Sequence, residues 1–198
     1  AASSDVYKRQ LCDLPTLCIE DNFDVGNAFL ARYDMEIGWV WAVSIANSQD
    51  LFLTDLYVDP YDAIHVSVLF RDMLDVNGTI FLGSSEPGVA LMMFDENGIL
   101  ESGHTAMSDL GVDPFGGFCQ NSIGETFIAL SFVGEISFEE SGSIESAGGS
   151  DIVVAKYDAN DWQWLQHAGS VNDDRTYGCI SGDDQSIQVY GSFEGNAS

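Results

Sequence analysis

Apolar runs that end in an aromatic residue and an aspartate recur three times along the chain. Their closing aspartates, Asp34, Asp95 and Asp158, lie 61 and 63 positions apart. Each run is as short as a strand, polar turn residues bound it, and the chain shows no sustained helical spacing of apolar positions. The pattern predicts an all-β chain made of tandem repeats of about 62 residues. The three runs are Asn27–Asp34, Val89–Asp95 and Asp151–Asp158.

The agreement between the repeats continues beyond these runs. Paired tryptophans follow the first and third runs, and His104 and His167 each lie nine residues after their aspartate. Cys119 and Cys179 each precede an apolar residue by eight positions. Both pairs are therefore expected at equivalent positions, with a structural role for the two histidines. The closing strands align as well, over Ile64–Phe70, Thr126–Phe132 and Ile187–Phe193.

Each repeat is expected to contain four short strands. Asn-Gly pairs at 77–78 and 97–98 favour the positive φ angles of tight hairpin turns. A four-stranded repeat of this length predicts consecutive antiparallel blades of a β-propeller, here 27–88, 89–150 and an incomplete 151–198. The strands expected in the last repeat are Ile152–Tyr157, Trp162–His167, Arg175–Ile180 and Ser186–Phe193.

The third repeat carries a resemblance to a known family. The segment Gly148–Asp158, followed by Trp162-Gln-Trp164 and closed by Gln188–Phe193, resembles the seven-bladed β-propeller repeat of bacterial and archaeal proteins. The resemblance implies a secreted or cell-surface propeller and no particular activity. Three repeats cannot close a ring of about 4 to 8 blades, so we expect an open fragment of a larger protein, without its neighbouring blades.

The first 26 residues stand outside the repeats. Asp5-Val-Tyr-Lys-Arg-Gln10 resembles the translated end of a transposon used to prepare sequencing libraries, so residues 1–10 are expected to be an artefact or disordered. Residues 11–26 are expected to end a preceding blade. The longest apolar runs, such as 38–46 and 63–70, are shorter than the roughly 18 residues of a membrane-spanning helix, and we expect no membrane insertion.

The charge balance excludes some partners. The chain has 6 Lys and Arg against 32 Asp and Glu, a formal charge of −26. Such a surface repels phosphate backbones and anionic lipids, so nucleic-acid binding is not expected. The excess of carboxylates has two possible roles, which are to keep the protein solvated and soluble or to bind divalent cations. Turn acids are the calcium candidates, but an Asp-x-Asp-x-Asp-Gly loop is absent, which favours solvation. The candidates are Asp59, Asp62, Asp113, Asp173, Asp174, Asp183 and Asp184.

No catalytic, cofactor-binding or metal-binding residue is predicted. The histidines are His65, His104 and His167, and the sequence has no nucleophile elbow, His-Glu-x-x-His motif or phosphate-binding glycine loop. Carboxylates are too abundant for a catalytic pair to be chosen from the sequence.

Four cysteines give two expectations. Cys12 and Cys18 are close enough to close a small disulfide loop in an oxidising compartment, and their spacing does not suggest zinc. Cys119 and Cys179 lie in adjacent repeats, where equivalent residues are usually too far apart to bridge, so buried thiols are expected.

The tryptophans bear on function. Trp39 and Trp41 point to opposite faces of one strand, as do Trp162 and Trp164, so one of each pair is expected to be exposed. Blade packing is the favoured role, and a sugar-stacking platform is the alternative.

The leading interpretation of the whole chain is a non-enzymatic extracellular scaffold or recognition module that binds protein or glycan. The alternative is an accessory propeller of a larger secreted enzyme, such as a polysaccharide-degrading protein.

Overall fold

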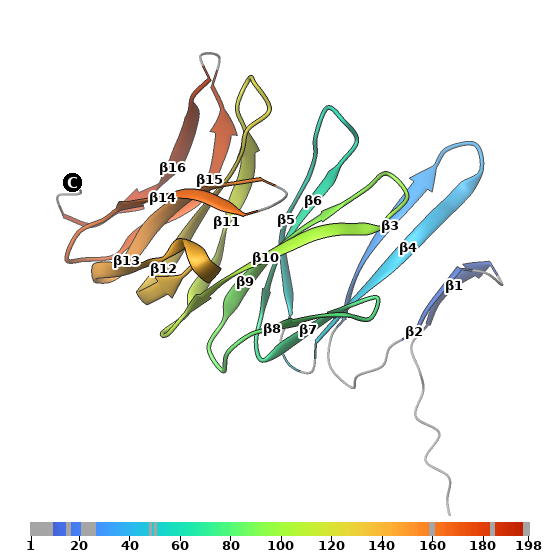
Figure 1. The fold of residues 1–198 in the computed structure, drawn as a ribbon, viewed down its shortest axis with the longest axis horizontal. Helices are drawn as coiled ribbons and strands as arrows, with labels where there is room; N and C mark the ends of the chain where they lie inside the picture. Colours follow the sequence, from blue (N-terminus) through green and yellow to red (C-terminus); the bar gives the residue numbers. More distant parts are fainter. Residues whose placement is uncertain are drawn as a thin grey trace, which may run out of the picture.

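The computed structural model describes residues 10–14, 17–20, 27–47, 49, 51–158, 161–182 and 185–195. The described chain is all-β and antiparallel, as predicted, apart from one short 3₁₀ turn, η1 (Glu139–Ser141). Figure 1 shows the sheets standing side by side. The strands are β1 (Gln10–Leu14), β2 (Leu17–Glu20), β3 (Ala28–Asp34), β4 (Gly38–Asn47), β5 (Phe52–Val58), β6 (Ile64–Phe70), β7 (Met73–Val76), β8 (Thr79–Leu82), β9 (Gly88–Phe94), β10 (Leu100–Ser108), β11 (Val112–Gln120), β12 (Thr126–Ser137), β13 (Ser143–Tyr157), β14 (Trp162–Ala168), β15 (Asp174–Ser181) and β16 (Ile187–Phe193).

Four strands of each repeat occupy corresponding places in the chain. The first strands are β3, β9 and β13, the second β4, β10 and β14, the third β5, β11 and β15, and the fourth β6, β12 and β16. In the last repeat these strands match the predicted segments to within one residue at each end, except that β13 begins at Ser143 rather than near Ile152.

Strand pairing crosses from one repeat to the next. The fourth strand β6 pairs with the first strand β9 of the following repeat, and β12 pairs with β13 in the same way. The hydrogen-bonded units are therefore β5–β6–β9–β10 and β11–β12–β13–β14, offset by two strands from the units expected at 27–88, 89–150 and 151–198. A short pairing of β10 with β12, at Met107 and Ser108, joins these two units into one sheet.

The first repeat contains a hairpin that the four-strand pattern does not include. Strands β7 and β8 turn at Asn77 and Gly78, whose φ angles of 50° and 91° match the expected Asn-Gly turn. Strand β7 then pairs with the end of β4, where Asn47 donates a side-chain hydrogen bond to the carbonyl of Arg71. The second repeat makes the corresponding bond from Ser108 to the carbonyl of Val133.

Three buried clusters lie between successive sheets. The first packs Ile45 against β6 and β9 through residues such as Phe70 and Phe94. The second packs the opposite face of β6 and β9 against β11, β12 and β13, with Phe132 at 0% exposure. The third holds Phe127 and Ala129 against β15 and β16. Strands β6 and β12 are therefore covered on both faces, which explains their nearly continuous apolar sequences.

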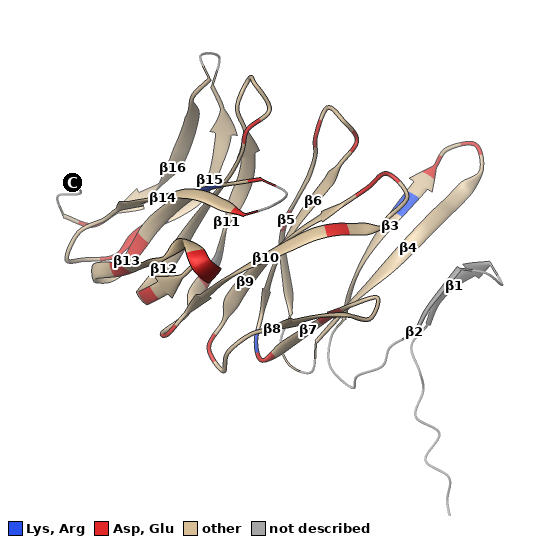
Figure 2. Ribbon diagram, in the orientation of Figure 1, with Lys and Arg blue, Asp and Glu red and all other residues tan. Residues whose placement is uncertain are grey.

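The N-terminal hairpin of β1 and β2 is a separate two-stranded sheet. Residues 1–9 lie outside the described residues, as do most of the connections from residue 15 to residue 26. None of the described segments forms a helix of the length and apolarity that crossing a bilayer requires. Figure 2 shows acidic residues gathered at hairpin turns, with few basic residues among them.

Candidate functional site

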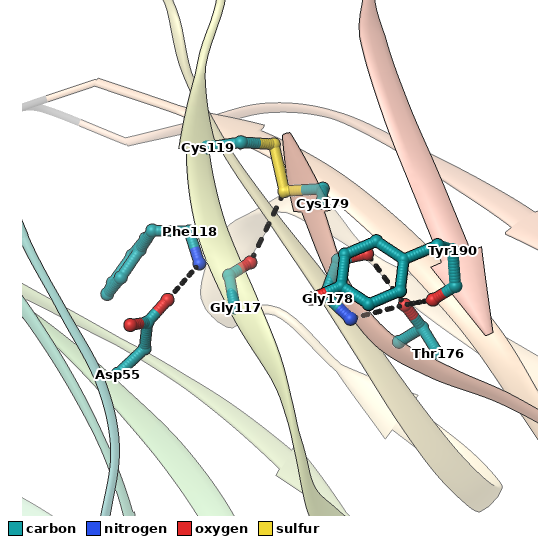
Figure 3. Close-up of a disulfide and its surroundings, with 8 residues drawn as sticks. All are labelled: Asp55, Gly117, Phe118, Cys119, Thr176, Gly178, Cys179 and Tyr190. Carbon is teal, nitrogen blue, oxygen red and sulfur yellow. Dashed lines mark hydrogen bonds between the residues drawn. A yellow bond between two sulfur atoms is a disulfide. The ribbon is translucent and has the colours of Figure 1, made fainter. Parts of the chain in front are cut away.

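The third strands of the three repeats lie against one another. The Asp55 carboxylate on β5 accepts a hydrogen bond of 2.9 Å from the backbone N–H of Phe118 on β11 (Figure 3). A Cβ atom on Gly117 would lie 2.9 Å from Asp55 Oδ2 and 3.7 Å from the Cα of Gly178 on β15. The missing side chain at Gly117 therefore allows three strands from three repeats to approach closely.

A disulfide bond joins β11 to β15, so the prediction of buried thiols at Cys119 and Cys179 was wrong. Their Cα atoms are 5.5 Å apart, and both residues are buried. The register shows why they can bridge. Phe118, rather than Cys119, lies opposite Ile128, while Cys179 lies opposite Val189, the residue that aligns with Ile128 in the repeat. The cysteines are one register step apart, so their side chains face each other across the gap between sheets.

The two histidines predicted to be equivalent also sit one register step apart. His104 lies opposite Leu91, whereas His167 lies opposite Val153, one position before the residue that aligns with Leu91. The turn after Asp158 is one residue shorter than the turn after Asp95, which causes the shift. As a result, His104 faces the aromatic cluster around Tyr157 while His167 contacts Asp151.

Each histidine has a carboxylate partner. His167 Nε2 lies 2.6 Å from Asp151 Oδ2, His104 Nδ1 lies 3.4 Å from Glu139 Oε2, and His65 Nε2 lies 3.5 Å from Asp59 Oδ2. These pairs come from different strands and loops. A structural role for His104 and His167 fits these contacts, because both rings join sheet strands to carboxylates on other elements.

His65 is the most enclosed of the three. Its Nδ1 lies 2.7 Å from the Tyr157 hydroxyl, and the two residues are 3% and 4% exposed. Burial lowers the pKa of His65, against the opposing effect of Asp59, and burial raises the pKa of Tyr157. His65 and Tyr157 are therefore part of the buried interior, where both rings also contact Phe118.

The turn aspartates mostly bind their own backbone. Asp34 accepts hydrogen bonds from the N–H groups of Glu36 and Ile37, and Asp95 accepts them from Asn97 and Ile99. The bond from Glu36 holds the pKa of Asp34 below its ordinary value, and the bond from Ile99 does the same for the pKa of Asp95. The aspartate that closes each apolar run therefore shapes the hairpin turn that follows it.

Among the described residues the calcium candidates do not form a cation site, although Asp113 and Asp173 both pair with Arg175. Asp59 accepts bonds from Tyr61 and Ala63, Asp113 pairs with Arg175, and Asp173 accepts a bond from Ser150. Asp174 is buried and accepts a bond from Glu194, and Asp62 lies at a turn with a φ of 66°. Asp183 and Asp184 lie outside the described residues. Within the described part of the chain, no three His, Cys, Asp or Glu side chains form a group that could hold a metal ion.

The tryptophan expectation holds for one pair. Trp162 is 4% exposed and Trp164 is 39% exposed, as alternation predicts, and Trp164 packs against Phe127 with ring centroids 5.7 Å apart. Trp39 and Trp41 are both half-buried, so the prediction was wrong for them. Both pairs span the same kind of register shift, between Arg32 and Tyr33 on β3 and between Lys156 and Tyr157 on β13, so this shift does not account for the difference between them.

Trp41 lines a groove in the described part of the chain. The groove has a volume of about 320 Å³ and lies between the β3–β4 hairpin and the β5–β6 hairpin. Its apolar wall includes Leu56 and Val58, which are 49% and 50% exposed. Its charged residues are Arg32, Asp62 and Glu96.

The neighbouring unit fixes the indole of Trp41. Trp41 Nε1 donates a 2.9 Å hydrogen bond to the carbonyl of Glu96, and Arg32 Nη1 donates a 3.1 Å bond to the same oxygen. A Cβ atom on Gly98 would lie 2.7 Å from the indole, so the glycine packs directly on the ring. Arg32 and Trp41 are also cross-strand partners. The groove is therefore formed before any ligand arrives.

The residues of this groove are spread over the whole first repeat and the start of the second. Sequence reasoning singled out Trp41 and Asp62 for other reasons and missed Arg32, Leu56, Val58 and Glu96 as a group. The signal available in the sequence was Arg32, a basic residue that stands directly before the aromatic Tyr33 at the end of the first apolar run. No protein-family model matches the sequence, and comparison with curated proteins gives no match.

Proposed function

We propose that the protein is a non-enzymatic recognition module of the β-propeller type that binds a glycan in the groove between β3–β4 and β5–β6. Two observations support the propeller assignment. The strands form antiparallel units of four that pack face to face, and the third strand of each repeat contacts the third strand of the next repeat. The groove opens between two such units, which is a common position for ligand sites in layered folds.

The observation that carries the glycan proposal is the lining of the groove around Trp41. An indole held from behind by Gly98 and from the edge by Glu96 offers a rigid apolar surface, which suits the C–H face of a sugar ring. Around it, Arg32 is a donor and Asp62 and Glu96 bring carboxylate acceptors, so sugar hydroxyls find both kinds of partner. The exposed Leu56 and Val58 give the ligand further apolar area to cover.

The charge of the chain narrows the ligand class. A formal charge of −26 repels anionic polysaccharides over the range that salt leaves unscreened. A neutral oligosaccharide avoids that repulsion, and one or two sugar rings match a groove of about 320 Å³. We therefore propose a neutral glycan as the ligand.

The proposed location is outside the cell or on its surface. The buried disulfide between Cys119 and Cys179 supports this, because structural disulfides persist mainly in oxidising compartments.

The test is binding of neutral oligosaccharides, first on an array and then by titration calorimetry. Trp41→Ala should weaken binding at least tenfold, and Asp62→Asn, which removes a charge at a turn residue that tolerates asparagine, should weaken it by a smaller factor. Trp164→Ala is the matched control, because Trp164 is the corresponding cross-strand partner of a basic residue, Lys156, in the third repeat. Thermal melts verify that each variant is folded. Binding that Trp41→Ala leaves unchanged, or the absence of any neutral glycan ligand, would refute the proposal.

A further inference from the structure

The turn that joins β5 to β6 has a backbone fixed by hydrogen bonds. The N–H of Asp59 donates to the carbonyl of Ala63, and the N–H of Asp62 donates to the carbonyl of Asp59. The Asp59 carboxylate also accepts hydrogen bonds of 2.8 and 2.9 Å from the N–H groups of Tyr61 and Ala63. Together these bonds hold the turn in one conformation.

The next repeat contains the same turn, between β11 and β12. Asn121 begins this turn, and its side-chain oxygen accepts the N–H groups of Ile123 and Glu125. The N–H of Asn121 donates to the carbonyl of Glu125, and the N–H of Gly124 donates to the carbonyl of Asn121. The turn therefore forms around an Asp or an Asn at its first position, with either a tyrosine or an isoleucine at its third position.

The fourth position of the turn also varies between repeats. Its φ angle is positive in all three, at 66° for Asp62, 85° for Gly124 and 67° for Gln185. A positive φ favours glycine, so the turn itself does not require the larger side chain of Asp62. The Asp62 carboxylate has no hydrogen-bond or ion-pair partner among the described residues, and it lines the groove that contains Trp41. The carboxylate is therefore available to a ligand in the groove.

Tyr61 stands next to Asp62 on this fixed turn. Its side chain is 83% exposed, more than that of any other described aromatic residue. Within the described part of the chain its ring packs on no other ring, and its hydroxyl has no hydrogen-bond partner. Tyr61 is not among the residues that line the groove, but its neighbour Asp62 is, so Tyr61 lies at the rim. An aromatic ring this exposed contributes little to the stability of the fold.

We propose that residues 59–63 form a second sugar-binding subsite and that the ligand is an oligosaccharide chain of at least three rings. This inference rests on the proposed glycan function and extends it. One or two rings occupy the groove of about 320 Å³ against Trp41. The next ring of the chain leaves the groove past the Asp62 carboxylate, which accepts hydrogen bonds from its hydroxyls, and stacks on the ring of Tyr61.

The fixed turn lowers the entropy cost of binding at this subsite. A ligand that must order a mobile loop loses binding free energy in doing so. Here hydrogen bonds to Asp59 order the turn beforehand, and Asp59 Oδ2 lies 3.5 Å from Nε2 of the buried His65, which connects the turn to the interior. Only the two side-chain torsions of Tyr61 remain to be ordered by the ligand.

The dependence of affinity on chain length tests the subsite. The probes are three pairs of neutral oligosaccharides, which are cellobiose with cellotetraose, maltose with maltotetraose, and mannobiose with mannotetraose. In titration calorimetry with the parent protein, the tetrasaccharide of the recognised pair should bind about three- to tenfold more tightly than its disaccharide. Tyr61→Ile, which introduces the residue of the corresponding turn, should bring this ratio of affinities close to one. Ile123→Ala is the matched control and should leave the ratio unchanged.

The outcomes separate the subsite from the groove. Thermal melts of Tyr61→Ile should match those of the parent, because the corresponding turn forms with Ile123 at this position. A parent that binds a disaccharide and its tetrasaccharide equally well would overturn the second subsite and leave the groove proposal in place. Retention of the full ratio by Tyr61→Ile would do the same. A parent that binds none of the probes would overturn the subsite together with glycan binding in the groove.

Discussion

The carboxylate of Asp55 accepts a hydrogen bond from the backbone N–H of Phe118, although 63 residues separate them along the chain. Asp55 and Gly117 take the same place in successive repeats, opposite Ser67 and Ala129. The bond therefore connects one repeat to the next at the strands that lie closest together. One repeat further on, the disulfide between Cys119 and Cys179 makes the corresponding connection.

Removing the Asp55 carboxylate should destabilise the contact between the first and second repeats. A hydrogen bond to a charged group is worth about 1.5–3 kcal/mol, so we expect Asp55→Ala to lower the free energy of unfolding by about 2 kcal/mol. Asp55→Asn is the control, because its amide oxygen can still accept the N–H of Phe118, and it should cost less than half as much. Urea unfolding followed by tryptophan fluorescence measures both. Equal losses from the two variants would contradict the role given to this hydrogen bond.

Loss of the disulfide should have a larger effect. The Cys119–Cys179 bond closes a loop of 60 residues, and its removal from both ends, as Cys119→Ala with Cys179→Ala, should cost about 2–4 kcal/mol. The reason is that the bond restricts the unfolded chain and also holds β11 against β15. Chemical unfolding of the double variant and the parent gives the difference. A loss below about 0.5 kcal/mol would show that the two strands are held together without the bond.

The turn aspartates give a prediction about acid. The pKa values of Asp34 and Asp95 are lowered from 3.8 by backbone hydrogen bonds in the folded chain, so the folded state binds a proton less readily than the unfolded state. The stabilisation is complete above pH 3.8 and is lost as the pH falls through the lower folded values. The double variant Asp34→Asn with Asp95→Asn should have a lower free energy of unfolding than the parent at pH 6. The difference in free energy between the two proteins should become smaller as the pH falls below 3.8. Glu101→Gln, at an exposed strand position, is the control for the loss of one negative charge.

Thermal melts in sodium, magnesium and calcium salts distinguish two roles of the acidic turns, which are solvation of the surface and specific binding of a cation. Outside residues 1–10, which contain Lys8, Arg9 and Asp5, 4 basic residues face 31 acidic residues, a balance of −27. Sodium chloride should raise the thermal midpoint by screening this repulsion. At matched ionic strength, calcium and magnesium should add no more than sodium. A rise in the midpoint with calcium alone would instead indicate specific calcium sites, with Asp173, Asp174, Asp183 and Asp184 as the first residues to substitute.

The sequence predicts the strands better than their partners. The apolar runs and turn residues locate the strands of the last repeat because the period-two pattern and turn chemistry are local signals. Which strand of the repeat begins each sheet is not a local property of the sequence. A tandem repeat reads the same whichever strand is taken as its beginning, so pairing of β6 with β9 across the expected boundary could not be read from the spacing of Asp34 and Asp95 alone.

The two mistaken equivalences have different causes. The turn after Asp158 is one residue shorter than the turn after Asp95, so counting from these aspartates misplaced His167 by one register step relative to His104. The turns that follow Cys119 and Cys179 are equally long, and counting to Phe127 and Ile187 failed because Thr126, rather than Phe127, aligns with Ile187. The groove around Trp41 was missed for a different reason, because Arg32, Leu56 and Glu96 meet only after the sheets stack.

Close packing of successive repeats through their third strands is the central claim, and peptide mapping under non-reducing conditions tests it most directly. The protein is purified without reductant, its free thiols are blocked at acidic pH, and it is digested and analysed by mass spectrometry. Four cysteines allow three fully bridged pairings, and only one of these joins β11 to β15. We predict a linked pair of peptides that contain Cys119 and Cys179, converted to two separate peptides by reduction. Blocked thiols at Cys119 and Cys179, or a link from either of them to Cys12 or Cys18, would contradict the packing described for β11 and β15.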